Sequence, residues 1–178
     1  VGAGALLLQK INNHELDMAL HTGQSSQPDV TSQFIGLTEH QWMAAHDLMM
    51  SEGDFLPAHA LNHRIVCNAP PSTLHESASR WLASEGYSFE EYSSCNSLSL
   101  MVALVASGHA IAMLPASITR QQVAEKSLQV LRAKPAVPNV PYYFSYLAHH
   151  RSDTTARILD IVLRNLQDAG FFQAEGSS

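Results

Sequence analysis

The stretch 93–97, Ser-Ser-Cys-Asn-Ser, gathers small polar residues directly ahead of an apolar segment. The spacing of apolar residues over 98–105 predicts a helix with one buried face. The start of a helix presents free backbone N–H groups and a partial positive charge, so it attracts anions. Ser94 and Asn96 are therefore candidate donors to a carboxylate. One residue of the stretch must cap the helix whatever the function is.

The helix is expected to stop at Gly108, because glycine adopts the left-handed cap without steric cost. The apolar run 110–114 then predicts a short strand covered on both faces, which Pro115 ends. Helices alternate with strands along most of the chain, which predicts an α/β fold with mixed, mainly parallel sheets. The backbone of Pro115 would then line the floor of a ligand site.

Three further residues have a functional and a structural interpretation, and the sequence leaves both open. Thr22 ends a buried strand, where ligands collect in open α/β sheets, but it could be only a turn residue. Trp42 could pack on an apolar part of a ligand or belong to the core. Cys95, at the start of the helix, should favour its thiolate, which is one condition for redox sensing. A sensor also needs a resolving thiol, and Cys67 is distant in sequence.

The ten histidines do not predict a metal site. His59 and His63 have a spacing that places two imidazoles on one helix face, but a metal needs three or four converging ligands. We also find no G-x-S-x-G, Walker or H-E-x-x-H motif. We therefore expect neither a metal, nor a cofactor, nor an enzyme.

Composition excludes several classes of protein. The 178 residues are 46% hydrophobic and 15% charged, as in an ordinary globular protein. A net charge of −6 with ten Lys and Arg argues against a nucleic-acid-binding face on this chain. Two cysteines predict no disulfide framework and favour a reducing, cytoplasmic compartment. No apolar run approaches a membrane span, and no secretory signal is visible.

Four pieces of the sequence resemble the effector-binding domain of LysR-type transcriptional regulators. Leu104 to Pro115, LVASGHAIAMLP, is similar to the LVxxGxGIxxLP signature of that family. Leu6 to Leu20 resembles the family's helix followed by leucine-Asp, and Trp42 to His46 resembles the strand that leaves its first lobe. Trp81 to Tyr87, WLASEGY, resembles a helix ending in glycine and an aromatic residue. Tyr142 to Phe172 then resembles the returning strand and last helix.

The resemblance implies a two-lobed, periplasmic-binding-protein-like fold of type 2 with two crossover strands. Lobe I would comprise 1–46 and 142–178, and lobe II would comprise 47–141. A small polar metabolite or organic anion would bind between the lobes. The ligand-binding residues would be Thr22, Trp42, Ser94, Cys95, Asn96 and Pro115.

The resemblance also implies partners outside this chain. The full-length protein would form a dimer or tetramer and would bind DNA only through an N-terminal helix-turn-helix, which this sequence lacks. The family's first strand and first helix are also missing ahead of Val1. The alternatives are a solute-binding module of a transport system, which the missing signal peptide and unpaired cysteines disfavour, and a small enzyme, which lacks a motif.

Overall fold

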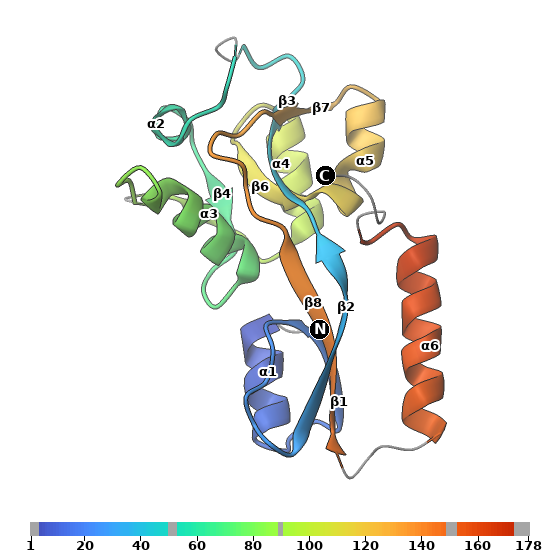
Figure 1. Cartoon of the computed structure of the whole chain (residues 1–178). Helices are drawn as coiled ribbons and strands as arrows, with labels where there is room; N and C mark the ends of the chain where they lie inside the picture. Colours follow the sequence, from blue (N-terminus) through green and yellow to red (C-terminus); the bar gives the residue numbers. More distant parts are fainter. Residues whose placement is uncertain (1–3, 50–52, 89–90, 149–152, 173–178) are drawn as a thin grey trace. The chain divides into compact units, whose positions relative to one another are not determined.

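The computed structural model describes residues 4–49, 53–88, 91–148 and 153–172. The chain forms two compact units: unit 1 is Val1–Thr38 with Asn139–Ser178, and unit 2 is Glu39–Pro138. The elements in chain order are α1 Gly4–Asn12, β1 Met18–Thr22, β2 Val30–Thr38, β3 His40–Ala45, α2 Pro57–Ala60, β4 Val66–Cys67, α3 Thr73–Ala83, β5 Ser93–Ser94, α4 Leu98–Ala106, β6 Ala112–Pro115, α5 Ala116–Ala124, β7 Leu128–Leu131, β8 Val140–Leu147 and α6 Asp153–Asp168 (Figure 1).

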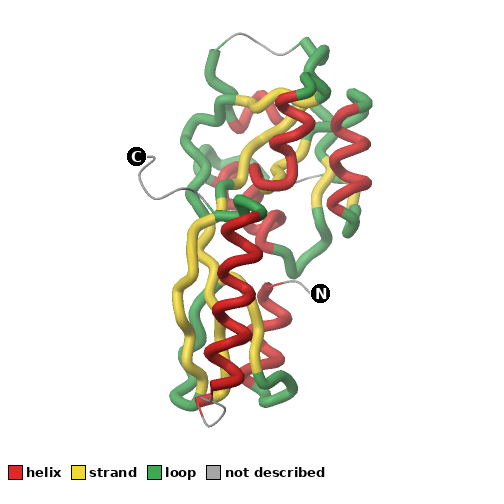
Figure 2. Tube along the Cα trace, turned by 90° about the vertical axis from the view of Figure 1, so that its right-hand side faces the viewer, coloured by secondary structure: helices red, strands yellow, loops and turns green. Residues whose placement is uncertain are grey.

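Unit 1 is a three-stranded antiparallel sheet in the order β1-β8-β2, with α1 and α6 on opposite faces (Figures 1 and 2). The α1 face buries Ile11 against Ala19, Val30 and Leu147. The ring of Tyr142 in β8 contacts the phenylalanines that follow α6, Phe171 and Phe172. Apolar residues of α1 near the start of the chain and of the segment after α6 near its end therefore pack on the same sheet.

Unit 2 has helices on both faces of its sheet, because the side chains of its strands alternate between two apolar clusters. Trp42 and Ala44 of β3 pack with α2 and α3, whereas Met43 packs with α4 and α5. The residues of β6 alternate in the same way, with Met113 in the first cluster and Ala112 and Leu114 in the second. A strand covered on both faces must be apolar throughout, which is the pattern seen over 110–114.

Strand direction in the sheets differs from the expectation. The sheets are mixed, but the long ladders are antiparallel: β3 pairs antiparallel with β6 and β7, and β8 with β1 and β2. Parallel pairing joins β4 to β5, with further bridges from Ile65 to Ile111 and from Phe55 to Ala133. The helical connection from β6 through α5 does lead to a parallel strand, β7, but β3 lies between them. Alternation of helices and strands therefore predicted the helical crossovers, but the prediction of mainly parallel sheets was wrong.

The boundary between the units also lies elsewhere than expected. The expected lobe I includes β3, with boundaries at 46/47 and 141/142. In the structure the units divide after Thr38 and after Pro138, because β3 hydrogen-bonds to β6 and β7 of unit 2. Within the described residues, no helix is long and apolar enough to cross a membrane.

The first residue of β3, His40, makes the stability of unit 2 depend on pH. Its side chain is buried, and its Nδ1 lies 3.2 Å from the Ser77 hydroxyl of α3. Burial lowers the pKa of His40 to about 4. Below about pH 6.5 His40 is protonated in the unfolded chain but stays neutral in the folded chain. The free energy of unfolding therefore falls as the pH falls.

We predict that the protonation of His40 in the unfolded chain lowers the free energy of unfolding by about 2 kcal/mol when the pH falls from about 7.5 to about 5. The measurement is the free energy of urea unfolding at both values for the native sequence and for His40→Gln. The variant, which cannot titrate at this position, should lose that much less on acidification. Equal losses in the two proteins would show that His40 does not titrate on unfolding.

Candidate functional site

The parallel strands of unit 2 bring four of the six predicted site residues, Ser94, Cys95, Asn96 and Pro115, to one edge of the sheet. The N–H of Ile111 donates to the Arg64 carbonyl at 2.9 Å, and the N–H of Val66 donates to the Ile111 carbonyl at 3.0 Å. These bonds align β4 with the start of β6, while β5 pairs along the other side of β4. The carboxyl ends of β4, β5 and β6 therefore meet at the same edge.

The connections leaving this edge diverge. From β4 the chain passes through α3 to β5 on one side, and from β6 it passes through α5 to β7 on the other. In open α/β sheets, ligands bind at the crevice outside the carboxyl ends of strands where outgoing connections diverge. We call the residues there the carboxyl-edge site; they are Asn68, Ser94, Cys95, Asn96, Pro115 and Ser117.

Hydrogen bonds between two loops fix the polar part of this site. The N–H of Cys95 donates to the Cys67 carbonyl at 2.9 Å, and Asn68 Nδ2 donates to the Cys95 carbonyl at 3.0 Å. Asn96 Oδ1 accepts from the N–H of Ala69 at 3.1 Å. Because the Oδ1 of Asn96 is engaged, its exposed amide is oriented so that the Nδ2 donors face away from this bond.

The helix that follows has the start and the end that the sequence predicts. Ser97 is the N-cap of α4, and its hydroxyl accepts from the N–H of Leu100. At the other end Gly108 adopts a φ of 76°, while its N–H donates to Val105 and that of His109 donates to Leu104. This pair of bonds is the Schellman arrangement, and it satisfies the last carbonyls of the helix. With Ser97 as the cap, Ser94 and Asn96 are not needed for that role.

Two residues at this edge have features that the sequence does not predict. Pro115 ends β6 and is also the N-cap of α5, and its carbonyl accepts from Thr119. Ser117 lies in the first turn of α5, and its buried hydroxyl has no hydrogen-bond partner among the described residues. A buried hydroxyl without a partner is costly unless a ligand or water supplies one. Ser117 carries no sequence signal beyond its place shortly after Leu-Pro.

Trp42 is placed in the core. Its side chain is 0% exposed and contacts the rings of Phe55 and Trp81 within the first apolar cluster. This supports the core-packing alternative. Thr22 ends β1 of unit 1, opposite Tyr142 of β8, as the sequence predicts for a strand end. Its neighbour His21 is buried, and burial lowers its pKa.

The two cysteines differ in accessibility. Cys67 is 1% exposed, and burial raises the pKa of its thiol to about 11, whereas Cys95 is partly exposed. Strand register pairs Cys67 with Ser94, so Cys67 and Cys95 point to opposite faces of the pair. Both thiols are free, and the arrangement does not bring them together as a disulfide. Within the described residues, no group of three metal-ligating side chains converges.

We predict that iodoacetamide at about pH 7.5 modifies Cys95 but not Cys67 in the folded protein, because only the thiolate of an accessible cysteine reacts readily. Mass spectrometry should find one adduct in buffer and two in urea. Cys95→Ser should give none in buffer. Labelling of both cysteines at similar rates in buffer would contradict the burial of Cys67.

Comparison with known proteins identifies the family. The family model of the LysR substrate binding domain matches residues 1–167. The regulatory domain of CcmR from Synechocystis PCC6803, in complex with 2-PG, aligns with a TM-score of 0.76 at 16% identity, over 93% of this chain and 80% of that one. The effector-binding domain of QuiR, in complex with shikimate, gives a TM-score of 0.72 at 18% identity, over 97% of this chain and 81% of that one.

Full-length regulators align as well. LysG from Corynebacterium glutamicum with bound Arg gives a TM-score of 0.72 at 18% identity, over 95% of this chain and 56% of that one. The chain thus spans little more than half of a full-length regulator of this kind. No curated protein matches it. At these identities the solved structures show the fold, a periplasmic-binding-protein-like fold of type 2, and the matched family model shows that this chain belongs to the LysR substrate-binding domains.

Proposed function

We propose that the chain is the effector-sensing regulatory domain of a LysR-type transcriptional regulator and that it binds a small polar metabolite or organic anion. The single observation that carries the proposal is the carboxyl-edge site, where exposed donors of Ser94 and Asn96 lie at the start of α4. That helix start favours a carboxylate by its free N–H groups and its dipole. The Ser117 hydroxyl, which has no hydrogen-bond partner in the described part of the chain, adds a donor that a ligand would satisfy.

A sensor must bind its ligand more tightly in one arrangement of the protein than in another. The carboxyl-edge site is formed by the loops that start α3, α4 and α5, so a ligand there would link three helices. The output would reach DNA through a domain outside this chain, in a full-length homo-oligomer. Such a regulator acts where the DNA is, which for this family implies the cytoplasm.

A thermal-shift screen with organic acids, amino acids and aromatic acids tests binding against catalysis. Saturation at about a hundred times the dissociation constant should stabilise the domain by about 2.7 kcal/mol. The stabilising compound should be recovered unchanged after prolonged incubation. Conversion of the compound would support an enzyme, and the absence of any stabilising compound would count against a sensor.

We predict that Ser94→Ala with Asn96→Asp abolishes stabilisation by that compound. Asn96 is changed to Asp because this keeps the oxygen that accepts from Ala69 while it removes the Nδ2 donors. The melting temperature without ligand should change little. Ser99→Ala, in the first turn of α4, is the matched control and should bind normally. Unchanged affinity in the double variant would refute the role of these donors.

We further predict that Thr22→Val weakens binding of the same compound by about 1–2 kcal/mol, the loss of one buried hydrogen bond. Titration calorimetry measures the loss. Thr31→Val, an exposed threonine of β2, is the control on the same sheet and should bind as the native sequence does. If Thr22→Val retains full affinity, Thr22 is only a turn residue.

A further inference from the structure

A pocket of about 810 Å³ opens at the amino ends of β4 and β5, on the opposite edge of the unit 2 sheet from the carboxyl-edge site. We call it the amino-edge pocket. Its lining comes from the segments 61–65 after α2, 86–88 after α3 and 91–93, which ends at the first residue of β5. Its volume lies within the range of about 300–1,000 Å³ that is typical of small-molecule sites.

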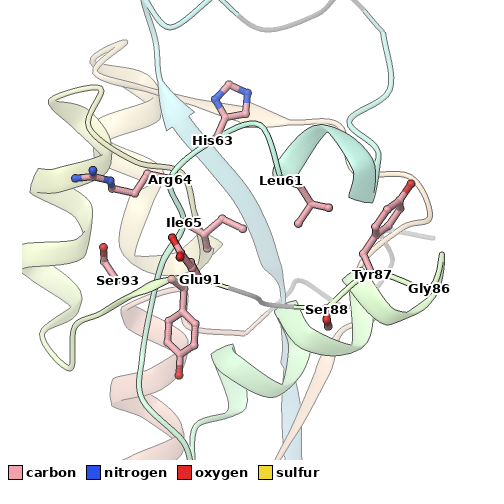
Figure 3. Close-up of a pocket in the computed structure, with 10 residues that line it drawn as sticks. Leu61, His63, Arg64, Ile65, Gly86, Tyr87, Ser88, Glu91 and Ser93 are labelled. Atoms are coloured by element: carbon pink, nitrogen blue, oxygen red, sulfur yellow. The ribbon is translucent and has the colours of Figure 1, made fainter.

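The two ends of the amino-edge pocket differ in chemistry (Figure 3). Arg64 and Glu91, on the segments that enter β4 and β5, lie toward one end with Ser93, the first residue of β5, and the guanidinium of Arg64 points outward from the other lining side chains. Leu61 and Tyr87 lie at the other end, and both are large apolar side chains left partly in solvent, 45% and 36% exposed. Ile65, which is buried, lies between the two ends. This polarity suits a ligand with a charged head and an apolar body.

Among the lining residues that the structure describes, the charged end offers one cation, Arg64, and one anion, Glu91. Neither Arg64 nor Glu91 forms an ion pair or side-chain hydrogen bond with any residue that the structure describes, whereas Asp54 of the same unit pairs with Arg132 and Lys134. The backbone next to these side chains is held by hydrogen bonds. The Arg64 carbonyl accepts from the N–H of Ile111, and the N–H of Ser93 donates to the Ile65 carbonyl. Burial and the neighbouring His59 lower the pKa of His63, which also lines the pocket, so its charged form is disfavoured.

We propose that the amino-edge pocket binds a zwitterionic α-amino acid with an aromatic or large aliphatic side chain. Its carboxylate pairs with Arg64, its ammonium pairs with Glu91, and its side chain lies along Leu61 and Tyr87. A simple organic anion would be repelled by Glu91, and a simple amine by Arg64, so only a ligand carrying both charges gains from both. Tyr87 supplies a face for an aromatic or aliphatic group.

L-phenylalanine is the probe, and the shifts of the backbone amides at Ile65, Ser88 and Ser93 in two-dimensional NMR report its binding. Phenylpropionate, which lacks the ammonium, and phenethylamine, which lacks the carboxylate, should each bind at least about tenfold more weakly, the usual loss on removing a charge-assisted pair. Equal binding of the three compounds would overturn the zwitterion assignment. No shift at these amides up to about 20 mM L-phenylalanine would overturn the site.

Substitutions of the two exposed residues Arg64 and Glu91 test which charged group of the ligand pairs with each of them. Arg64→Gln should weaken L-phenylalanine at least about tenfold and abolish its advantage over phenethylamine, because the carboxylate loses its partner. Glu91→Gln should abolish the advantage over phenylpropionate. Arg80→Gln, on the exposed face of α3 outside the pocket, is the control and should leave all three affinities unchanged. Unchanged affinity in both pocket variants would contradict the proposal, and none of these outcomes depends on the carboxyl-edge site.

Discussion

Two backbone hydrogen bonds, from the N–H of Ile111 to the Arg64 carbonyl and from the N–H of Val66 to the Ile111 carbonyl, align the strands that form the candidate site. They join the parallel pair β4/β5 to the antiparallel strands β6, β3 and β7. Because of them, three strand ends that are far apart in sequence meet at one edge of unit 2. The same bonds leave the amino ends of β4 and β5 at the other edge, where the amino-edge pocket opens. The alignment of β4 with β6 therefore determines where both the carboxyl-edge site and the amino-edge pocket lie.

Local patterns predicted the parts of this arrangement that local chemistry decides. The helix α4, its cap and its end at Gly108 follow from spacing, a small polar residue and a glycine, and all of them are confirmed. Strand neighbours did not follow, because the insertion of β3 between β6 and β7 depends on pairing between distant residues. The same long-range pairing moved the boundary of unit 2 to Glu39.

The candidate site shows the same division between local and long-range causes. Ser94 and Asn96 could be placed ahead of the helix from the sequence, because a helix start has a recognisable composition, and their binding role remains a proposal. Trp42 could not be resolved between surface and core, because only packing with Phe55 and Trp81 decides it. The buried hydroxyl of Ser117 has no sequence signal, since its burial depends on how α5 packs on the sheet. The same holds for the amino-edge pocket, whose lining comes from three separate segments.

The central claim is that a stabilising ligand contacts the carboxyl edge of unit 2. The most direct test is amide hydrogen exchange measured with and without the compound found to stabilise the domain. The account predicts slowed exchange at the N–H groups of 68–69, 96–98 and 116–117, which belong to the three loops that follow β4, β5 and β6. Protection confined to other segments, with these amides exchanging as fast as in the free protein, would contradict it.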